Sequence, residues 1–219
     1  MFIGHFAIGL GLKKAAPRVS LGTLFLAAQF IDLLWPSLLL LGIERVELAP
    51  GAAGPPLNFT HYPVSHSLLM VLVWSALFGT AYWLIRRHPA GAWVCAAAVL
   101  SHWLLDLVVH HPDLPLYPGG AQRLGFGLWN SLPGSLAVEL LLFGAGTWLY
   151  WRSTRALDRI GSAGFWSLIA FLLLIHAANV FGSPPPSVAA VAWVGHAQWL
   201  IVLWGYWIDR HRGAPVTQR

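Results

Sequence analysis

The segment 101–113 carries the most informative set of chemically active side chains in the sequence. Within it, His102, Asp106 and His110 are spaced four residues apart, so on a helix they lie on one face, a turn from one another. An imidazole and a carboxylate in this arrangement can bind one divalent ion or bridge two. The spacing therefore predicts a metal site on this helix.

Further imidazoles and carboxylates occur in other apolar segments, among them His5, Asp32, His66 and Glu139. A charged carboxylate at the centre of a bilayer costs at least ~2.5 kcal/mol, so the acids need compensating partners. At a helical rise of about 1.5 Å per residue, Asp32, Asp106 and Glu139 share a layer roughly 20–24 Å from the basic ends of their segments. We expect ligands from several helices of a bundle to meet in this layer.

These motifs resemble those of the bacterial membrane-bound metal-dependent hydrolases, a family described as LexA-regulated inner-membrane hydrolases. The resemblance covers about the first half of the chain and rests on His5-Phe6-Ala7-Ile8-Gly9, Asp32, His61 through Ser67, and His102 through Asp106. The order of these residues is also remotely similar to the multi-zinc site of zinc-dependent phospholipase C. The chain departs from the family pattern at Gln29-Phe30-Ile31-Asp32, where the family often has Pro-Asp-x-Asp.

The resemblance implies a metal-dependent hydrolase in the bacterial inner membrane. Its divalent ion, zinc or alternatively manganese, is expected on His5, Asp32, His66, His102 and Asp106. Such an ion activates water for attack on the substrate. Catalytic roles are then expected for Glu139 or His110 as the proton acceptor and for Arg123 as a partner of a phosphate. The expected substrate is a phosphoester or ester of a membrane lipid or lipid-linked small molecule, reached from the outer leaflet.

Three other functions are compatible with the same residues. Histidines within the apolar segments could be axial ligands of a b-type haem in an electron carrier: His66, His102, His176 and His196. Intramembrane acids and histidines also occur as proton relays in ion-coupled transporters. A non-catalytic relative that only binds lipid is the third possibility. Glu139 could equally be a structural partner of His176 or His196.

The elements that must position these residues are membrane-spanning helices. The chain of 219 residues is 57% hydrophobic and only 10% charged, whereas soluble domains carry about 25% charged residues. About six segments have the roughly 17–25 apolar residues that a span needs, namely 19–43, 64–85, 90–111, 134–151, 164–182 and 187–208. We predict an all-α, polytopic membrane helix bundle over residues 1–219, with residues 1–12 as a half-helix that is inserted or lies at the interface.

Basic residues and loops predict the topology of this bundle. Eleven of the thirteen Lys and Arg residues fall on one side of the predicted spans, and only Arg45 and Arg123 fall on the other. The positive-inside rule then places both termini, including a short tail after Asp209, in the cytoplasm. The two longer outer loops, 44–63 and 112–133, are rich in Pro and Gly and are predicted to be irregular.

The composition also excludes several kinds of site. Cys95 is the only cysteine, so neither an intramolecular disulfide nor a zinc site of several cysteines is possible. The formal charge of +5 comes from short basic clusters between apolar runs, which is typical of membrane topology and not of a nucleic-acid-binding surface. No sequence feature predicts an oligomeric state.

Overall fold

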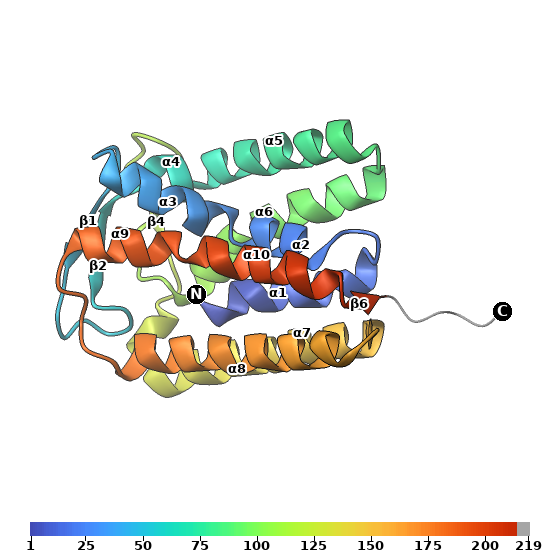
Figure 1. The fold of residues 1–219 in the computed structure, drawn as a ribbon. Coiled ribbons are helices and arrows are strands. Elements are labelled where there is room, and N and C mark those ends of the chain that lie inside the picture. The colour runs from blue at the N-terminus through green and yellow to red at the C-terminus, as the bar shows by residue number, and fades with distance from the viewer. Residues whose placement is uncertain (214–219) are drawn as a thin grey trace.

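The computed structural model describes residues 1–213 and has the predicted all-α architecture (Figure 1). Long helices run side by side along one axis, and short strands lie only at the two ends of the bundle. The α-helices are α1 Ile3–Ala15, α2 Leu21–Ala28, α3 Phe30–Leu40, α4 Pro63–His66, α5 Leu68–Arg86, α6 Pro89–Val109, α7 Leu132–Ser153, α8 Arg159–Phe181, α9 Val188–His196 and α10 Gln198–Asp209. The helical fold class is thus confirmed.

Five to six helices are long and apolar enough to cross a membrane, which identifies a multi-pass membrane protein. The five are α5, α6, α7, α8 and the segment Val188–Asp209, which comprises α9 and α10. The sixth is the pair α2 and α3, which bends by 54° at Gln29. The predicted span 19–43 corresponds to this pair, which is broken at Gln29 and is not one straight helix.

Helix α1 is inserted into the bundle and does not lie at its surface (Figure 1). It packs chiefly against α7, with further contacts to α2 and α6. Ile3, Phe6 and Leu10 have no exposed surface. A Cβ atom added at Gly146 of α7 would lie 2.3 Å from the carbonyl oxygen of Ala7, so the two helices approach at backbone distance. Of the two placements expected for residues 1–12, the inserted half-helix is the one observed.

The predicted irregular loops contain short antiparallel strand pairs. β1 (Arg45–Leu48) pairs with β2 (Leu57–His61), and β3 (Leu114–Pro115) pairs with β4 (Arg123–Leu124). The β1–β2 hairpin lies at one end of the bundle, opposite the end at which α5, α7 and α10 finish (Figure 1). Pro and Gly correctly indicated turns, but the sequence missed the strands between them.

At the other end, β5 (Arg155–Ala156) pairs with β6 (Arg212–Gly213). The segment that follows Asp209 is therefore fixed to the bundle as far as Gly213, and Arg212 is buried. This corrects the expectation of a free tail directly after Asp209. The remainder of that predicted tail lies outside the described residues.

Candidate metal centre

The five predicted metal ligands meet inside the bundle, although they come from four different helices. α1 contributes His5, α3 contributes Asp32, α4 contributes His66, and α6 contributes His102 and Asp106. Two groups of possible ligands are formed, His5–Asp32–His102 and His66–His102–Asp106, and within each group the ligand atoms lie within 4.8 Å of one another. We call these five residues the His/Asp cluster.

Four imidazole–carboxylate separations within the cluster are close to those between the ligands of one metal ion. His102 Nε2 is 3.2 Å from Asp106 Oδ2 and 3.5 Å from Asp32 Oδ1, and His66 Nε2 is 3.9 and 3.5 Å from the same two oxygens. Ligands that bind zinc at about 2.0–2.1 Å in a tetrahedron lie about 3.3 Å from one another. The four measured separations are close to this value, and the ligand atoms form two triads, His5–Asp32–His102 and His66–His102–Asp106, each of which could contact one ion.

A break in the chain fixes the orientation of His102. Ala28 is the last residue of α2, and its carbonyl oxygen lies 2.9 Å from His102 Nδ1. Since a carbonyl only accepts hydrogen bonds, Nδ1 carries a proton and Nε2 is the nitrogen that faces the cluster. His102 Nε2 is buried and makes no hydrogen bond. A metal ion is the partner that such an orphaned, inward-facing nitrogen fits best.

His66 is oriented by a buried carboxylate that the sequence analysis missed. Ser65 Oγ donates to Glu44 Oε2 at 2.6 Å and accepts from His66 Nδ1 at 2.6 Å, so His66 also presents Nε2 to the cluster. Glu44 Oε1 accepts from the backbone amides of Val64 and Ser65, both at 2.8 Å. The sequence spacing of Glu44 and Ser65 did not predict their contact, because a hairpin of some twenty residues brings them together. Only the rarity of acidic residues in this chain could have indicated a role for Glu44.

His5 and Asp106 complete the buried side of the cluster. The rings of His5 and His102 are stacked, with centroids 3.7 Å apart and an angle of 7° between their planes. Asp106 Oδ1 is 3.1 Å from His5 Nε2 and 2.7 Å from the Met1 amine, while Oδ2 faces His102. Asp106 thereby connects α1 to the ligand set. His5 Nδ1 is buried without a hydrogen-bond partner.

Access to the cluster lies on the side of Asp32. Its side chain is 24% exposed, whereas those of His5, His66, His102 and Asp106 are between 0 and 4% exposed. Phe30 and Leu34 next to it on α3 are also partly exposed. A molecule could therefore reach the ligands past α3, along an apolar surface.

Comparisons of the chain with protein-family models, curated proteins and solved structures give no match. The family resemblance rests on the motif residues quoted above. The geometry of the His/Asp cluster carries the functional argument.

Glu139, expected to be a proton acceptor, contacts helix α1. Its Oε2 accepts from the backbone amides of Phe2 and Gly4, at 2.9 and 3.4 Å, and thus satisfies free N–H groups at the start of α1. His176 Nδ1 lies 4.0 Å away, which agrees with the structural alternative for Glu139. His196 has an aromatic contact with Trp193 and no ion pair with a carboxylate in residues 1–213. A catalytic role for Glu139 stays a prediction.

His110 and Arg123, the other two expected catalytic residues, lie outside the cluster's ligand groups. α6 ends at Val109, so His110 leaves the helical path of His102 and Asp106. His110 Nδ1 is 2.9 Å from Asp113 Oδ1, which also accepts from the Tyr62 hydroxyl at 2.8 Å. Burial, and then Asp113, raise the pKa of Tyr62 above its ordinary value, so Tyr62 remains a neutral donor. Arg123 is exposed and donates to the Gly120 carbonyl oxygen at 2.9 Å.

Proposed function

We propose that this protein is an integral membrane metal-dependent hydrolase that cleaves a phosphoester or ester bond of a lipid-linked substrate. The observation that carries the proposal is the convergence of three imidazoles and two carboxylates into two overlapping triads of possible ligands inside the bundle. Hydrogen bonds of the opposite ring nitrogens support it, because they orient His66 and His102 so that Nε2 faces the cluster. The family resemblance gives the same reaction class.

The donor set fits zinc, with manganese as the alternative. Imidazole nitrogens and carboxylate oxygens are both ordinary zinc ligands, and carboxylates also suit manganese. When bound, such an ion supplies the Lewis acidity that activates water and polarises the substrate oxygen. His66, His102 and Asp106 would hold one ion, and His5 and Asp32, which form the other ligand group with His102, are the candidates for binding a second.

The remaining residues are assigned by what they contact. Asp113 fixes His110 through Nδ1, so His110 Nε2 is proposed to accept a proton during hydrolysis. Glu139 is proposed to position α1, and with it His5, through its bonds to Phe2 and Gly4. Arg123, which has no carboxylate within 4.0 Å in the described part of the chain, is proposed to neutralise a substrate phosphate.

A lipid-linked substrate is favoured by the surroundings of the cluster. The side of access at Asp32 lies on a helix pair that is apolar enough to span the membrane. A water-soluble substrate would have to cross this apolar surface, whereas the head group of a lipid reaches it laterally. The positive-inside rule would place the cluster toward the outer leaflet and the basic helix ends in the cytoplasm. We assign the protein to the bacterial inner membrane on the resemblance alone.

The same geometry argues against the haem alternative. The rings of His5 and His102 stack at 3.7 Å, and two carboxylates occupy the space that their nitrogens face. A porphyrin needs imidazoles on the two faces of its ring and no carboxylate ligand at the iron. Visible absorption of the purified protein distinguishes the two, since a Soret band would contradict the hydrolase proposal.

The bend at Gln29 keeps an ion-coupled transporter as a second candidate. Transporters place substrate sites at discontinuous helices near the middle of the membrane, and α2–α3 is a discontinuous span beside the cluster. Here the break has a local role, because it presents the Ala28 carbonyl to His102. Flux of zinc or protons into liposomes that contain the protein, without hydrolysis of any lipid, would favour the transporter.

Elemental analysis combined with a hydrolysis assay tests the proposal. The purified wild-type protein is expected to contain about one or two equivalents of zinc or manganese, and His102→Ala and Asp106→Ala are expected to lose it. Both variants should lose hydrolysis of a phosphatidic acid or a p-nitrophenyl ester in mixed micelles. His196→Ala, which changes a histidine in a span but outside the cluster, is the matched control. Metal content unchanged in both cluster variants would refute the metal centre.

A further inference from the structure

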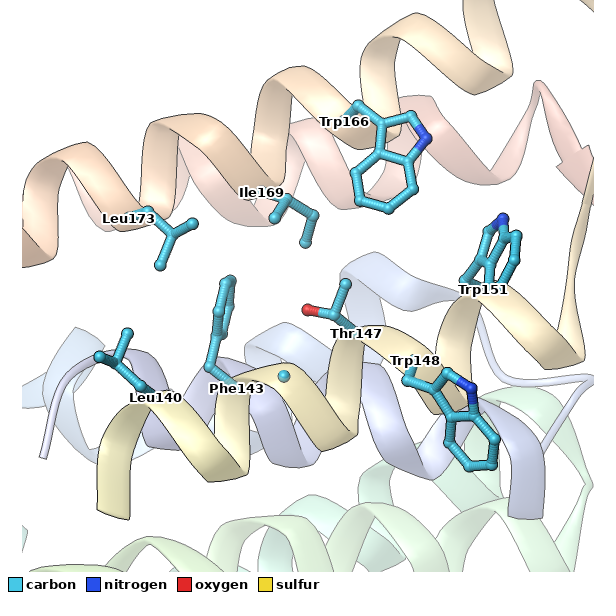
Figure 2. A pocket seen from close by; sticks show the side chains of 9 residues that line it. Leu140, Phe143, Thr147, Trp148, Trp151, Trp166, Ile169 and Leu173 are labelled. Atoms are coloured by element: carbon cyan, nitrogen blue, oxygen red, sulfur yellow. The ribbon is translucent and has the colours of Figure 1, made fainter. Parts of the chain in front are cut away.

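A second candidate site lies between α7 and α8, on helices that contribute no residue to the His/Asp cluster. A groove of about 380 Å³ separates the two helices and is lined almost entirely by apolar side chains. Figure 2 shows Leu140 and Leu173 at one end of this α7–α8 groove, Phe143 and Ile169 along it, and Trp151 and Trp166 at the other end. The groove faces outward, since Trp148, Trp151 and Trp166 are about half exposed.

The groove has the length of one lipid chain. Leu140 and Trp151 are eleven residues apart on α7, which corresponds to about 16 Å at the rise of an α-helix. One leaflet contributes about half of the roughly 30 Å hydrocarbon thickness of a bilayer. An acyl chain that starts at Trp151 and Trp166 would therefore reach Leu140 and Leu173 near the middle of the membrane.

At its tryptophan end the groove continues into a second, polar cavity of about 460 Å³. Trp151 and Trp166 line both cavities, so the two are adjacent. The second cavity, which we call the arginine pocket, is lined by Arg152, Arg155 and Arg212 together with the hydroxyl residues Thr154 and Ser162. Tryptophan side chains favour the level of the lipid head groups, which is where the apolar groove meets these cations.

No carboxylate of residues 1–213 neutralises the charge of the arginine pocket. In residues 1–213, none of its three arginines has a carboxylate oxygen within 4.0 Å. Arg212 is only 6% exposed; it donates to Thr154 Oγ1 and to the Gly161 carbonyl oxygen and lies over the Phe165 ring. These neutral partners hold the guanidinium in place and leave its positive charge without a counter-ion. A buried cation of this kind calls for an anion at the pocket.

We infer that the α7–α8 groove and the arginine pocket together form a binding site for an anionic phospholipid. The phosphate of the head group would lie among Arg152, Arg155 and Arg212, and one acyl chain would lie in the groove between Phe143 and Ile169. Basic pockets between transmembrane helices at the cytoplasmic side bind anionic head groups for the same electrostatic reason. This site is independent of the hydrolase proposal, since it shares no residue with the His/Asp cluster.

Native mass spectrometry of the full chain in detergent tests this inference with defined lipids. Phosphatidylglycerol is expected to bind saturably and at least tenfold more tightly than phosphatidylcholine, and inorganic phosphate is expected to bind far more weakly than either lipid. The double variant Arg152→Gln/Arg155→Gln should weaken phosphatidylglycerol roughly 20- to 30-fold, at roughly fivefold for each basic residue. Arg86→Gln/Arg87→Gln removes two exposed arginines from the same end of the bundle, on and beside α5, and is the matched control.

A separate variant tests whether the α7–α8 groove binds an acyl chain. A Cβ at Gly144 meets no atom within 4 Å, so Gly144→Leu can fold and fill the groove. It should weaken both lipids, whereas Ala145→Leu, at an exposed position beside it, should not. Equal affinity for the two lipids, or wild-type affinity in the double arginine variant, would overturn the inference. Binding of inorganic phosphate as tightly as the lipid would reassign the pocket to a soluble anion, and wild-type lipid binding by Gly144→Leu would remove the groove from the site.

Discussion

Polar side chains are placed differently in the two halves of the chain. The first half ends with α6, and the second half begins with α7. In the first half, Asp106 and His102 lie deep in the bundle, 3.2 Å from one another, and each contacts other buried polar groups. In the second half, α7 and α8 are unbroken helices. Apart from the buried Glu139 of α7, their charged side chains lie at or beside the helix ends, as at Arg152 and Asp158. The difference indicates that the first half is built around a buried ligand, whereas the second is built to face lipid.

Helix breaks account for this difference. Each helix that supplies a cluster residue begins or ends close to it: α1 begins at Ile3, α3 begins after the break at Gln29, α4 ends before Ser67, and α6 ends at Val109. These interruptions expose backbone groups, such as the Ala28 carbonyl, that orient imidazoles. α7 and α8 each run for more than twenty residues without such a break.

Removal of the Asp106 carboxylate, at the centre of the first half, should have the largest effect on stability. Asp106→Ala leaves His102, His5 and the Met1 amine without their shared acceptor, and loss of one member of a buried ion pair costs about 3–5 kcal/mol. We expect a loss of unfolding free energy of this size in detergent, measured by chemical denaturation. Glu47→Ala, at an exposed acid of β1, is the control and should change little. A stability equal to that of wild type would mean that the buried polar groups do not depend on one another.

Separation of α1 from α7 should have the next largest effect. Gly146→Leu places a side chain against the Ala7 carbonyl oxygen, and overpacking of this kind costs about 1–3 kcal/mol. We expect the variant to keep its helical circular dichroism but to lose part of its metal, because His5 moves with α1. Gly144→Leu, on the open face of the same helix, should keep its metal. Full metal content in Gly146→Leu would show that His5 is not needed for binding.

The hydrogen bonds that connect Glu44 to His66 through Ser65 allow a test of metal affinity. Glu44→Gln weakens the acceptor of the Ser65 hydroxyl, which in turn orients His66. Loss of an outer partner of a metal-binding histidine typically lowers affinity 10- to 100-fold. Competition of the purified protein with a chromogenic zinc chelator measures this change. Thr60→Ala, which removes an exposed hydroxyl in β2, is the control; equal affinities of the two variants would separate Glu44 from the site.

The smallest effect is expected at the exposed end of the second half. Asp158 accepts from His211 Nδ1 at 2.7 Å and caps α8 through the Gly161 amide. The bond with His211, and then the Gly161 amide, lower the pKa of Asp158. Its stabilisation is therefore complete above the ordinary pKa of an aspartate and is lost as the pH falls through the lowered folded value. Hydrogen-exchange protection of the start of α8, corrected for intrinsic rates, should fall only in acid, and Asp158→Asn should remove that dependence.

Individual residues show where sequence reasoning succeeded. The i, i+4 spacing of His102 and Asp106 reports on a single helix, and it predicted their contact correctly. The convergence of His5, Asp32 and His66 was predicted from the free-energy cost of placing polar groups among apolar ones. This cost favours contacts between polar groups that are distant in the sequence.

Other features depend on tertiary contacts that no local pattern records. The bend at Gln29 and the relay through Glu44 exist because distant helices need a carbonyl and a carboxylate at particular points. His110 continues the spacing of His102 and Asp106, but the helix ends one residue before it. The burial of Arg212 likewise results from pairing between two strands separated by more than fifty residues.

The packing of α1 on α7 has a consequence for how the protein is made. α1 is synthesised before its main neighbour, α7. α7 contains Glu139, whose carboxylate accepts from the first amides of α1, and it is synthesised more than a hundred residues later. Nascent chains that end after α6 already contain Asp32, His66, His102 and Asp106, but α1 has no α7 to hold it. The His/Asp cluster is therefore completed late in synthesis, when α7 enters the membrane and packs against α1.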